Sequence, residues 1–376
     1  PMNPLRKGSP DFLLMFLTLI LTGFGILMVF SASSATAAIE YNDSLYFTKR
    51  QIIWAVAGLF LMLILMNIPF QWWKKLIFPI FLMAIVSLVL VLIIGVERNG
   101  ARSWFQIGPF GGQPTEFAKL AVIMYLATLI SRKGEKFRDF KRGLLPVMII
   151  VGIVCALIMM QPDLGSCFIL VLTAGLVIIA GGANLKHILL SGLSLGCILG
   201  FVLGGYLLFT PADEIKSYRI DRFTAYLDPW ADPLDTGFQL IQSLYAFGHG
   251  GVTGAGFGQS IQKLHYLPYA YNDFIFAVIG EELGLIGALT VLLALLLLMW
   301  RALIISLRCP DIFGTLLGTG IVGMIGIQAI INLGGVTGLI PITGVTLPFI
   351  SYGGSSLLVT LMSMGILLNI SRYTST

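Results

Sequence analysis

The chain has 376 residues, of which 57% are hydrophobic and only 11% are charged, and its formal net charge is +5. Soluble domains carry about 25% charged residues, so this composition, with a mean hydropathy of +0.92, excludes a soluble globular protein. The 4 cysteines have no paired spacing and indicate neither a disulfide framework nor a zinc site.

Long apolar runs recur along the whole chain. Most have roughly the 17–25 residues that a helix needs to cross about 30 Å of hydrocarbon. We predict spans at about 12–32, 51–69, 76–96, 116–131, 144–160, 164–182, 188–210, 274–300, 312–334 and 351–370. The sequence therefore predicts an all-α polytopic membrane protein with ten transmembrane helices, which form a single integral membrane domain over residues 1–376.

The basic residues indicate the orientation. If the N-terminus is cytoplasmic, most of the 23 Lys and Arg residues fall on the inner side, nearly all in short loops. Short cytoplasmic loops are enriched in Lys and Arg, so we expect both termini in the cytoplasm. Most acids fall on or near the outer side, which indicates an extracytoplasmic working face.

The connection between the seventh and eighth spans, residues 211–273, is too long to serve only as a link. Residues 218–227 place apolar side chains at helical spacing beside basic ones, as an amphipathic helix at a membrane interface does. Residues 238–247 repeat a helical pattern after a Pro-rich break at 228–235. We therefore predict a large extracytoplasmic loop that contains amphipathic helices.

Asp273 stands at the boundary between this loop and the eighth span. One interpretation is a helix N-cap, in which Asn272 or Asp273 satisfies an otherwise unpaired main-chain N–H group. The other is a general base, which needs a carboxylate held at a substrate hydroxyl and shielded from bulk water. The two roles are compatible only if the side chain turns outward.

Three further acids lie at or near membrane depth. Glu281 and Glu282 fall within the eighth span, where an ionisable group is costly unless it is paired or functional. We expect structural pairing with a base or with neighbouring helices, and a direct proton role is the alternative. Asp163 lies in a tight outer turn after Pro162, so turn formation and a site role are both open.

Several cations lie at outer ends of spans. Glu116 and Lys119 are three residues apart and share one helical face, which indicates an ion pair within the helix. Alternatively, Lys119 offers its ammonium group to a phosphate while Glu116 holds it. Arg50 and Arg102 could add cations, because the planar guanidinium group binds two phosphate oxygens at once. The alternative for each arginine is a lipid headgroup anchor.

Residues 338–356 combine Pro, Gly and hydroxyl side chains, among them Ser351 and Ser355. Irregular backbone at membrane depth survives only where it is buried in protein or lines a cavity, so we expect this segment to form one cavity wall. Gln328 and Asn332 share a face of the ninth span, and we expect them to join helices through hydrogen bonds.

A series of short motifs follows in order along most of the chain. They are Asn99-Gly-Ala-Arg-Ser-Trp104, Gln113-Pro-Thr-Glu-Phe-Ala-Lys119, Gln161-Pro-Asp-Leu-Gly165, Asp228-Pro-Trp-Ala-Asp-Pro233, Gly237-Phe-Gln-Leu-Ile-Gln-Ser243, Asn272-Asp-Phe-Ile-Phe-Ala277, Glu281-Glu-Leu-Gly284 and Leu347-Pro-Phe-Ile-Ser-Tyr-Gly-Gly-Ser-Ser356. Through these motifs the chain resembles the SEDS family (shape, elongation, division and sporulation). Residues 330–344 and 369–373 resemble the FtsW/SpoVE branch more than the RodA branch.

The resemblance implies a ten-helix peptidoglycan glycosyltransferase that polymerises lipid II at the outer face of the bacterial plasma membrane. It also implies a class B penicillin-binding protein as the cross-linking partner. The catalytic carboxylate of the family maps onto Asp273. The chain departs from the family pattern at Tyr269, where Glu is common, and at Asn272, where Thr is common.

Lipid II would present a pyrophosphate to Arg50, Lys119 and Arg102 and a sugar hydroxyl to Asp273. Undecaprenyl pyrophosphate would leave with inversion, its charge stabilised by cations or by a divalent metal. Whether Mg²⁺ or Mn²⁺ takes part stays open, because the sequence has no metal-ligand spacing. We expect membrane lipids, and no nucleic acid, among the partners. The candidate substrate-binding residues are Arg50, Arg102, Glu116, Lys119, Asp163, Glu281, Ser351 and Ser355.

Two other functions would use the same charged and polar residues. A lipid II flippase would also have a cavity with charges at membrane depth, but transporters usually carry repeated halves, and no internal repeat is visible. A scaffold that only positions the cross-linking partner would leave the buried acids and Lys119 unexplained.

Overall fold

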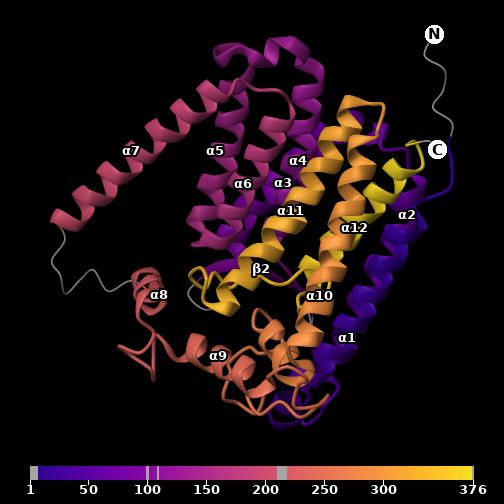
Figure 1. Cartoon of the computed structure of the whole chain (residues 1–376). Coiled ribbons are helices and arrows are strands. Elements are labelled where there is room, and N and C mark those ends of the chain that lie inside the picture. Colours follow the sequence, from indigo (N-terminus) through magenta and orange to yellow (C-terminus); the bar gives the residue numbers. More distant parts are fainter. Residues whose placement is uncertain (1–6, 99–100, 108–109, 210–217, 375–376) are drawn as a thin grey trace.

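The computed structural model describes residues 7–98, 101–107, 110–209 and 218–374. Figure 1 shows a bundle of long helices with α8 and α9 at one end, and α7 diverging from the other helices. The helices are α1 (Phe12–Tyr41), α2 (Tyr46–Asn67), α3 (Gln71–Ile94), α4 (Pro114–Lys133), α5 (Leu145–Met160), α6 (Leu164–Ala180), α7 (Leu185–Phe209), α8 (Tyr218–Leu227), α9 (Phe238–Gly250), α10 (Ile275–Leu307), α11 (Ile312–Thr337) and α12 (Gly354–Ser371). Two short helical turns, η1 (Gly134–Arg138) and η2 (Phe140–Leu144), connect α4 to α5.

Eight helices in the described part of the chain are long and apolar enough to cross a membrane. The predicted multi-pass helical membrane protein is therefore confirmed. The predicted total of ten depends on two shorter apolar helices, α6 with 17 residues and the part of α7 from Leu185 to Cys197. The total of ten spans is thus not established.

Aspartate side chains begin three of the membrane helices. Asp11, Asp163 and Asp311 are the N-cap residues of α1, α6 and α11, and each accepts a hydrogen bond from a main-chain N–H group of the first turn. The N···O distances are 2.8, 3.0 and 3.0 Å. Such caps satisfy donors that a helix start leaves unpaired.

Burial divides the helices into an inner and an outer group. Within the spans, 78% of α4, 72% of α11 and 78% of α12 is buried, against 22–28% of α2, α3 and α5. Close approach between the two groups depends on glycine: a Cβ atom at Gly365 of α12 would lie 2.7 Å from the carbonyl oxygen of Met62 in α2. Small residues at helix contacts are typical of membrane bundles, where helices gain stability from close packing.

The connection between α3 and α4 contains antiparallel strands, which the all-α prediction missed. In the described ranges these are β1 (Val96–Arg98), β2 (Ala101–Ile107) and β3 (Phe110–Gly112), in the order β1-β2-β3. Val96 pairs with Trp104, and Phe105 pairs with Gly112. Aromatic residues favour strands, but their signal here was masked by the glycines on both sides.

α10 is broken at Gly284, whose φ and ψ angles are 67° and −166°. The eighth span was predicted as one uninterrupted helix, so this is a correction. Residues 251–256, here called the inserted loop, fill the break with their own backbone. The N–H groups of Ala255, Gly256, Leu285 and Ile286 donate to the carbonyls of Glu281, Glu282, Gly251 and Val252, over 2.9, 3.0, 2.9 and 3.2 Å respectively.

The predicted helices of the long outer loop are present as α8 and α9. In Figure 1 they lie at the end of the bundle where α10 begins. The two ends of the described chain meet at the opposite end, where the N–H group of Gly8 donates to the carbonyl of Arg372 over 2.7 Å. Both termini therefore lie on the same side of the bundle, away from α8 and α9.

Candidate functional site

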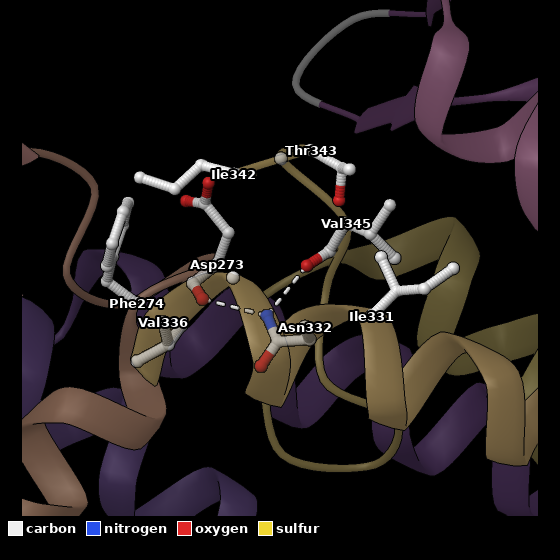
Figure 2. Close-up of a pocket in the computed structure, with 10 residues that line it drawn as sticks. Asp273, Phe274, Ile331, Asn332, Val336, Ile342, Thr343 and Val345 are labelled. Atoms are coloured by element: carbon white, nitrogen blue, oxygen red, sulfur yellow. Dashed lines mark hydrogen bonds between the residues drawn. The ribbon is translucent and has the colours of Figure 1, made fainter. Parts of the chain in front are cut away.

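Asp273 precedes α10 by two residues and does not cap it. The N-cap residue is Phe274, whose side chain is apolar, so the N-cap interpretation of Asp273 is wrong. The main-chain carbonyl of Asp273 faces Asn332, while its carboxylate points toward Ile342 (Figure 2). The side chain is thus turned away from the first turn of α10 and toward the cleft.

The carboxylate borders a small cleft whose accessible volume is about 10 Å³, room for about one water molecule. Asn332 of α11 holds two walls of this cleft together, because its amide donates to the carbonyls of Asp273 over 2.8 Å and of Val345 over 2.7 Å. This confirms that Asn332 joins separate elements. The lining residues are Asp273, Phe274, Ile331, Asn332, Gly335, Val336, Ile342, Thr343, Gly344 and Val345.

Arg222 of α8 brings a cation close to Asp273. A Cβ atom at Gly344 would lie 3.9 Å from Oδ2 of Asp273 and 3.8 Å from Nη1 of Arg222, so both groups surround the same small space. The guanidinium group also donates to the carbonyl of Ile342 over 3.3 Å. Gly344 has φ 75° and leaves the space between carboxylate and guanidinium open.

Burial raises the pKa of Asp273 to about 6, because the surrounding protein removes water from the carboxylate; its own main-chain N–H group and the charge of Arg222 oppose this shift. A carboxyl group loses its proton more reluctantly when it is desolvated. A pKa close to neutral is what an efficient general base needs, since the group is then ionised at working pH and still basic enough to take a proton.

Arg222 is a candidate site residue that the sequence analysis did not single out. The amphipathic pattern of residues 218–227 was recognised, but its arginines were assigned to the membrane interface. α8 instead docks onto residues 339–342, through Arg222 and through the hydroxyl of Tyr226, which donates to the carbonyl of Leu339 over 3.0 Å. The useful signal was an arginine on a helix in the same outer loop as Asp273.

The cations predicted to bind phosphate lie elsewhere. Lys119 is buried, with 1% of its surface exposed, and it binds Glu116 at 3.0 Å and the side chain of Gln328 at 3.2 Å. The ion pair within the helix is therefore confirmed. Arg50 lies over the ring of Tyr46, 4.4 Å from its centroid.

Arg102 is exposed on β2. Arg50, Arg102 and Lys119 are not among the described residues that line the cleft of Asp273. Their contact with substrate stays a prediction.

Asp163, Ser351 and Ser355 have structural partners. Besides capping α6, Asp163 accepts from the side chain of Gln113 over 2.9 Å. The hydroxyl of Ser351 accepts from the N–H group of Leu347 over 2.8 Å, and that of Ser355 accepts from the N–H group of Gln113 over 3.2 Å. These contacts hold the segment around 347–355 against α4. A substrate role for the three residues stays a prediction.

Glu281 and Glu282 are 0% and 1% exposed. Glu282 binds Lys263 at 2.9 Å, and Glu281 binds His249 at 2.8 Å. The expected structural pairing is therefore confirmed for both acids. The predicted contact of Glu281 with substrate gains no support from a side chain enclosed in this way.

The divalent cation has no candidate ligand set in the part of the chain that the structure describes, where no group of three or more His, Cys, Asp or Glu residues could hold a metal ion. Participation of Mg²⁺ or Mn²⁺ stays an open alternative.

Residues 12–376 match the family model for FtsW, RodA and SpoVE, described as cell cycle protein. Stage V sporulation protein E of Bacillus subtilis (strain 168) is 47% identical over 370 residues, which cover 98% of either chain. A probable peptidoglycan glycosyltransferase FtsW of Geobacter sp. (strain M18) is 41% identical over 97% of this chain and 98% of its own.

Two solved structures share the fold. A chain in a peptidoglycan synthase complex that coordinates polymerization and crosslinking has a TM-score of 0.80 at 31% identity, over 97% of this chain and 98% of that one. The rod shape determining protein RodA of Thermus thermophilus has a TM-score of 0.69 at 28% identity, over 97% of both chains.

Proposed function

The chain belongs to the FtsW/RodA/SpoVE family of cell cycle proteins, and from this premise we propose that it is a peptidoglycan glycosyltransferase that polymerises lipid II into glycan strands. Its relatives include proteins named probable peptidoglycan glycosyltransferase. The observation that carries the proposal is the carboxylate of Asp273, which faces the cleft beside Arg222 and has its pKa raised to about 6.

The carboxylate of Asp273 takes the proton from the 4-hydroxyl of the acceptor GlcNAc as that oxygen attacks the anomeric carbon of the growing chain. The new glycosidic bond forms while the bond to the diphosphate breaks, and undecaprenyl pyrophosphate leaves with inversion. No nucleotide sugar is required, because the diphosphate lipid is already an activated leaving group.

Arg222 adds a cation close to Asp273 to those first predicted for the diphosphate. Its guanidinium group shares the space around Gly344 with the carboxylate, so it can stabilise negative charge that develops as the diphosphate departs. A fixed donor aimed at developing charge in a water-poor site is usually the largest single contribution to such catalysis. The charge of Arg222 also keeps Asp273 ionised more readily than burial alone would allow.

The cleft has an accessible volume of about 10 Å³, against roughly 300–1,000 Å³ for typical ligand pockets. We infer that only the reacting hydroxyl of a sugar enters it, since this volume holds about one water-sized group. The rest of the disaccharide, its peptide and the polyprenyl tail lie outside it, toward the outer loop and the lipid.

We place Asp273 at the outer face and both termini in the cytoplasm. In Figure 1, α8, α9 and the start of α10 lie at one end of the bundle and the two ends of the described chain lie at the other, which supports this orientation, as does the distribution of Lys and Arg. We also propose a class B penicillin-binding protein as partner, because a solved relative belongs to a synthase complex that joins polymerization to crosslinking.

The test uses the purified chain with its cross-linking partner, lipid II in detergent or vesicles, and gel detection of labelled glycan. Asp273→Asn should abolish polymer while complex formation stays intact. Asp235→Asn is the matched control, since Asp235 is an exposed carboxylate of the same outer loop, and it should polymerise normally. Unchanged polymer from Asp273→Asn would refute the proposal, and transport of lipid II without polymer would favour a flippase.

A further inference from the structure

The two buried acids of α10 hold a segment of the outer loop that the reaction does not touch directly. Glu281 accepts hydrogen bonds from the N–H groups of Ile261 over 2.9 Å and Gln262 over 3.3 Å, and from the hydroxyl of Ser260. His249 adds a contact of 2.8 Å. Bonds to an ionised carboxylate are about twice as strong as neutral ones, so one side chain fixes the whole turn at 260–262.

Glu282 holds the next residue of the same turn. It accepts from Nζ of Lys263 over 2.9 Å and from the hydroxyl of Ser31 in α1 over 2.7 Å. The ammonium group of Lys263 also donates to Ser31 over 3.1 Å and to the carbonyl of Gly258 over 2.9 Å. A Lys ammonium has three donors, and these contacts employ each of them. We call Glu281, Glu282, Lys263, Ser260 and Ser31 the latch.

The latch and the inserted loop fasten the same stretch of chain at two places. The inserted loop completes the hydrogen bonding of α10 across the break at Gly284, and the latch begins four residues further along the chain. The latch therefore connects the outer loop to α10 and, through Ser31, to α1. Between the latch and α10 only residues 264–274 remain, and Asp273 is among them.

Residues 264–272 are held in a strained conformation. His265 and Tyr269 have φ angles of 68° and 55°, in the left-handed region that side-chain-bearing residues rarely adopt. Such residues persist only where the surrounding structure over-determines them. The segment 264–272 is held at one end by the latch at Lys263 and at the other by the hydrogen bond from Asn332 to the carbonyl of Asp273. If the latch opens, the strain can relax, and the carboxylate then moves away from Arg222.

We propose that Glu281 and Glu282 are positioning residues, which clamp residues 260–263 against α10 and α1 and thereby hold Asp273 at the cleft. This inference rests on the proposed function. In this inference Glu281 does not contact the substrate. It affects the reaction by holding the segment that carries Asp273.

The experiment compares Glu282→Gln, Lys263→Met and the double variant in the complex with the cross-linking partner. Each single change leaves one buried charge without its partner, and the double change removes both. We expect polymerisation per folded molecule to fall at least tenfold in Glu282→Gln with KM for lipid II little changed. We also expect amide hydrogen exchange of residues 264–273 to increase.

The decisive readout is the dependence of turnover on pH. On the acidic side of the pH profile, called the acid limb, wild-type turnover should rise with pH as Asp273 loses its proton. Desolvation is the main cause of the raised pKa of Asp273, and latch variants let water reach that carboxylate, so their acid limb should move to lower pH. Arg301→Met is the matched control: it breaks the ion pair between Arg301 and Asp11 on the far side of the bundle, 2.5 Å long, and should lower stability without moving the limb.

Ser260→Ala is the milder variant if the charge changes prevent folding, since it removes a neutral donor to Glu281. The inference is overturned if Glu282→Gln has the pH profile and the turnover per folded molecule of the wild type. If only Ser260→Ala folds, the same result for that variant overturns it. Asp273→Asn is measured in the same series. If it polymerises, the proposed function fails; if it is inactive while latch variants behave as wild type, only the latch inference fails.

Discussion

The carboxylate of Asp273 should weaken the fold that holds it. Its pKa rises from 3.8 to about 6 because of burial, a difference of about two pH units. At about 1.36 kcal/mol per unit, the ionised side chain lowers the free energy of unfolding by about 3 kcal/mol at pH 8. Asp273→Asn removes that charge, so we expect an inactive variant that is more stable than the wild type.

The sign of the effect follows from the proton count. Between pH 3.8 and about 6 the folded protein holds the proton on Asp273 more tightly than the unfolded chain does, so wild-type stability falls as pH rises through this window. Below it both states are protonated and the penalty vanishes. The advantage of Asp273→Asn should therefore be full at pH 8, about half gone near pH 5 and absent below about pH 3.

Thermal unfolding in detergent, followed by intrinsic fluorescence at several pH values, measures this difference. About 3 kcal/mol corresponds to a rise in Tm on the order of 5 °C for a domain of this size. Asp235→Asn, which changes an exposed carboxylate of the same loop, should leave Tm unchanged. A Tm difference between Asp273→Asn and wild type that is the same at pH 5 and pH 8, or of opposite sign, would show that Asp273 is not a desolvated carboxyl group.

Three further predictions concern the surroundings of the site. Arg222→Gln should lower kcat by roughly 10²–10³, the loss found when one donor to a developing charge is removed, and Arg222→Lys should be intermediate. Equal turnover of the wild type and both variants would exclude a catalytic role for the charge of Arg222. Gly344→Ala should destabilise by about 1 kcal/mol because φ is 75°, and it should also reduce turnover, since its Cβ enters the space between Arg222 and Asp273; unaltered kinetics and Tm would contradict this. Lys119→Met should destabilise by about 3–5 kcal/mol because it leaves Glu116 buried without a partner; adding Glu116→Gln should recover most of the loss in Tm, and no recovery would refute the pairing.

Hydropathy and charge placement predicted the long helices well, because a membrane span must be both long and apolar. They could not predict the break in α10. Gly284 lies in an apolar run where glycine is common, and the groups that fill the break come from Gly251 and Val252, far back in the chain. Nothing local to residues 275–307 indicates that contact.

The site was predicted in part. Asp273 stood out because a carboxylate at the start of a span is conspicuous, but cap and base differ only in where the side chain turns. Lys119 was placed near phosphate because sequence spacing cannot show that Gln328 lies within 3.2 Å of it. Arg222 was overlooked because its nearness to Asp273 depends on how α8 folds back onto residues 339–342.

The inserted loop has a consequence for biogenesis. Residues 251–256 precede α10 in the chain, yet they supply the partners of peptide groups in the middle of that helix. Within hydrocarbon such groups would have no alternative partner. Until residues 251–256 have folded against α10, the peptide groups at the break lack their hydrogen-bond partners. Completion of this helix therefore depends on the loop that precedes it in the chain.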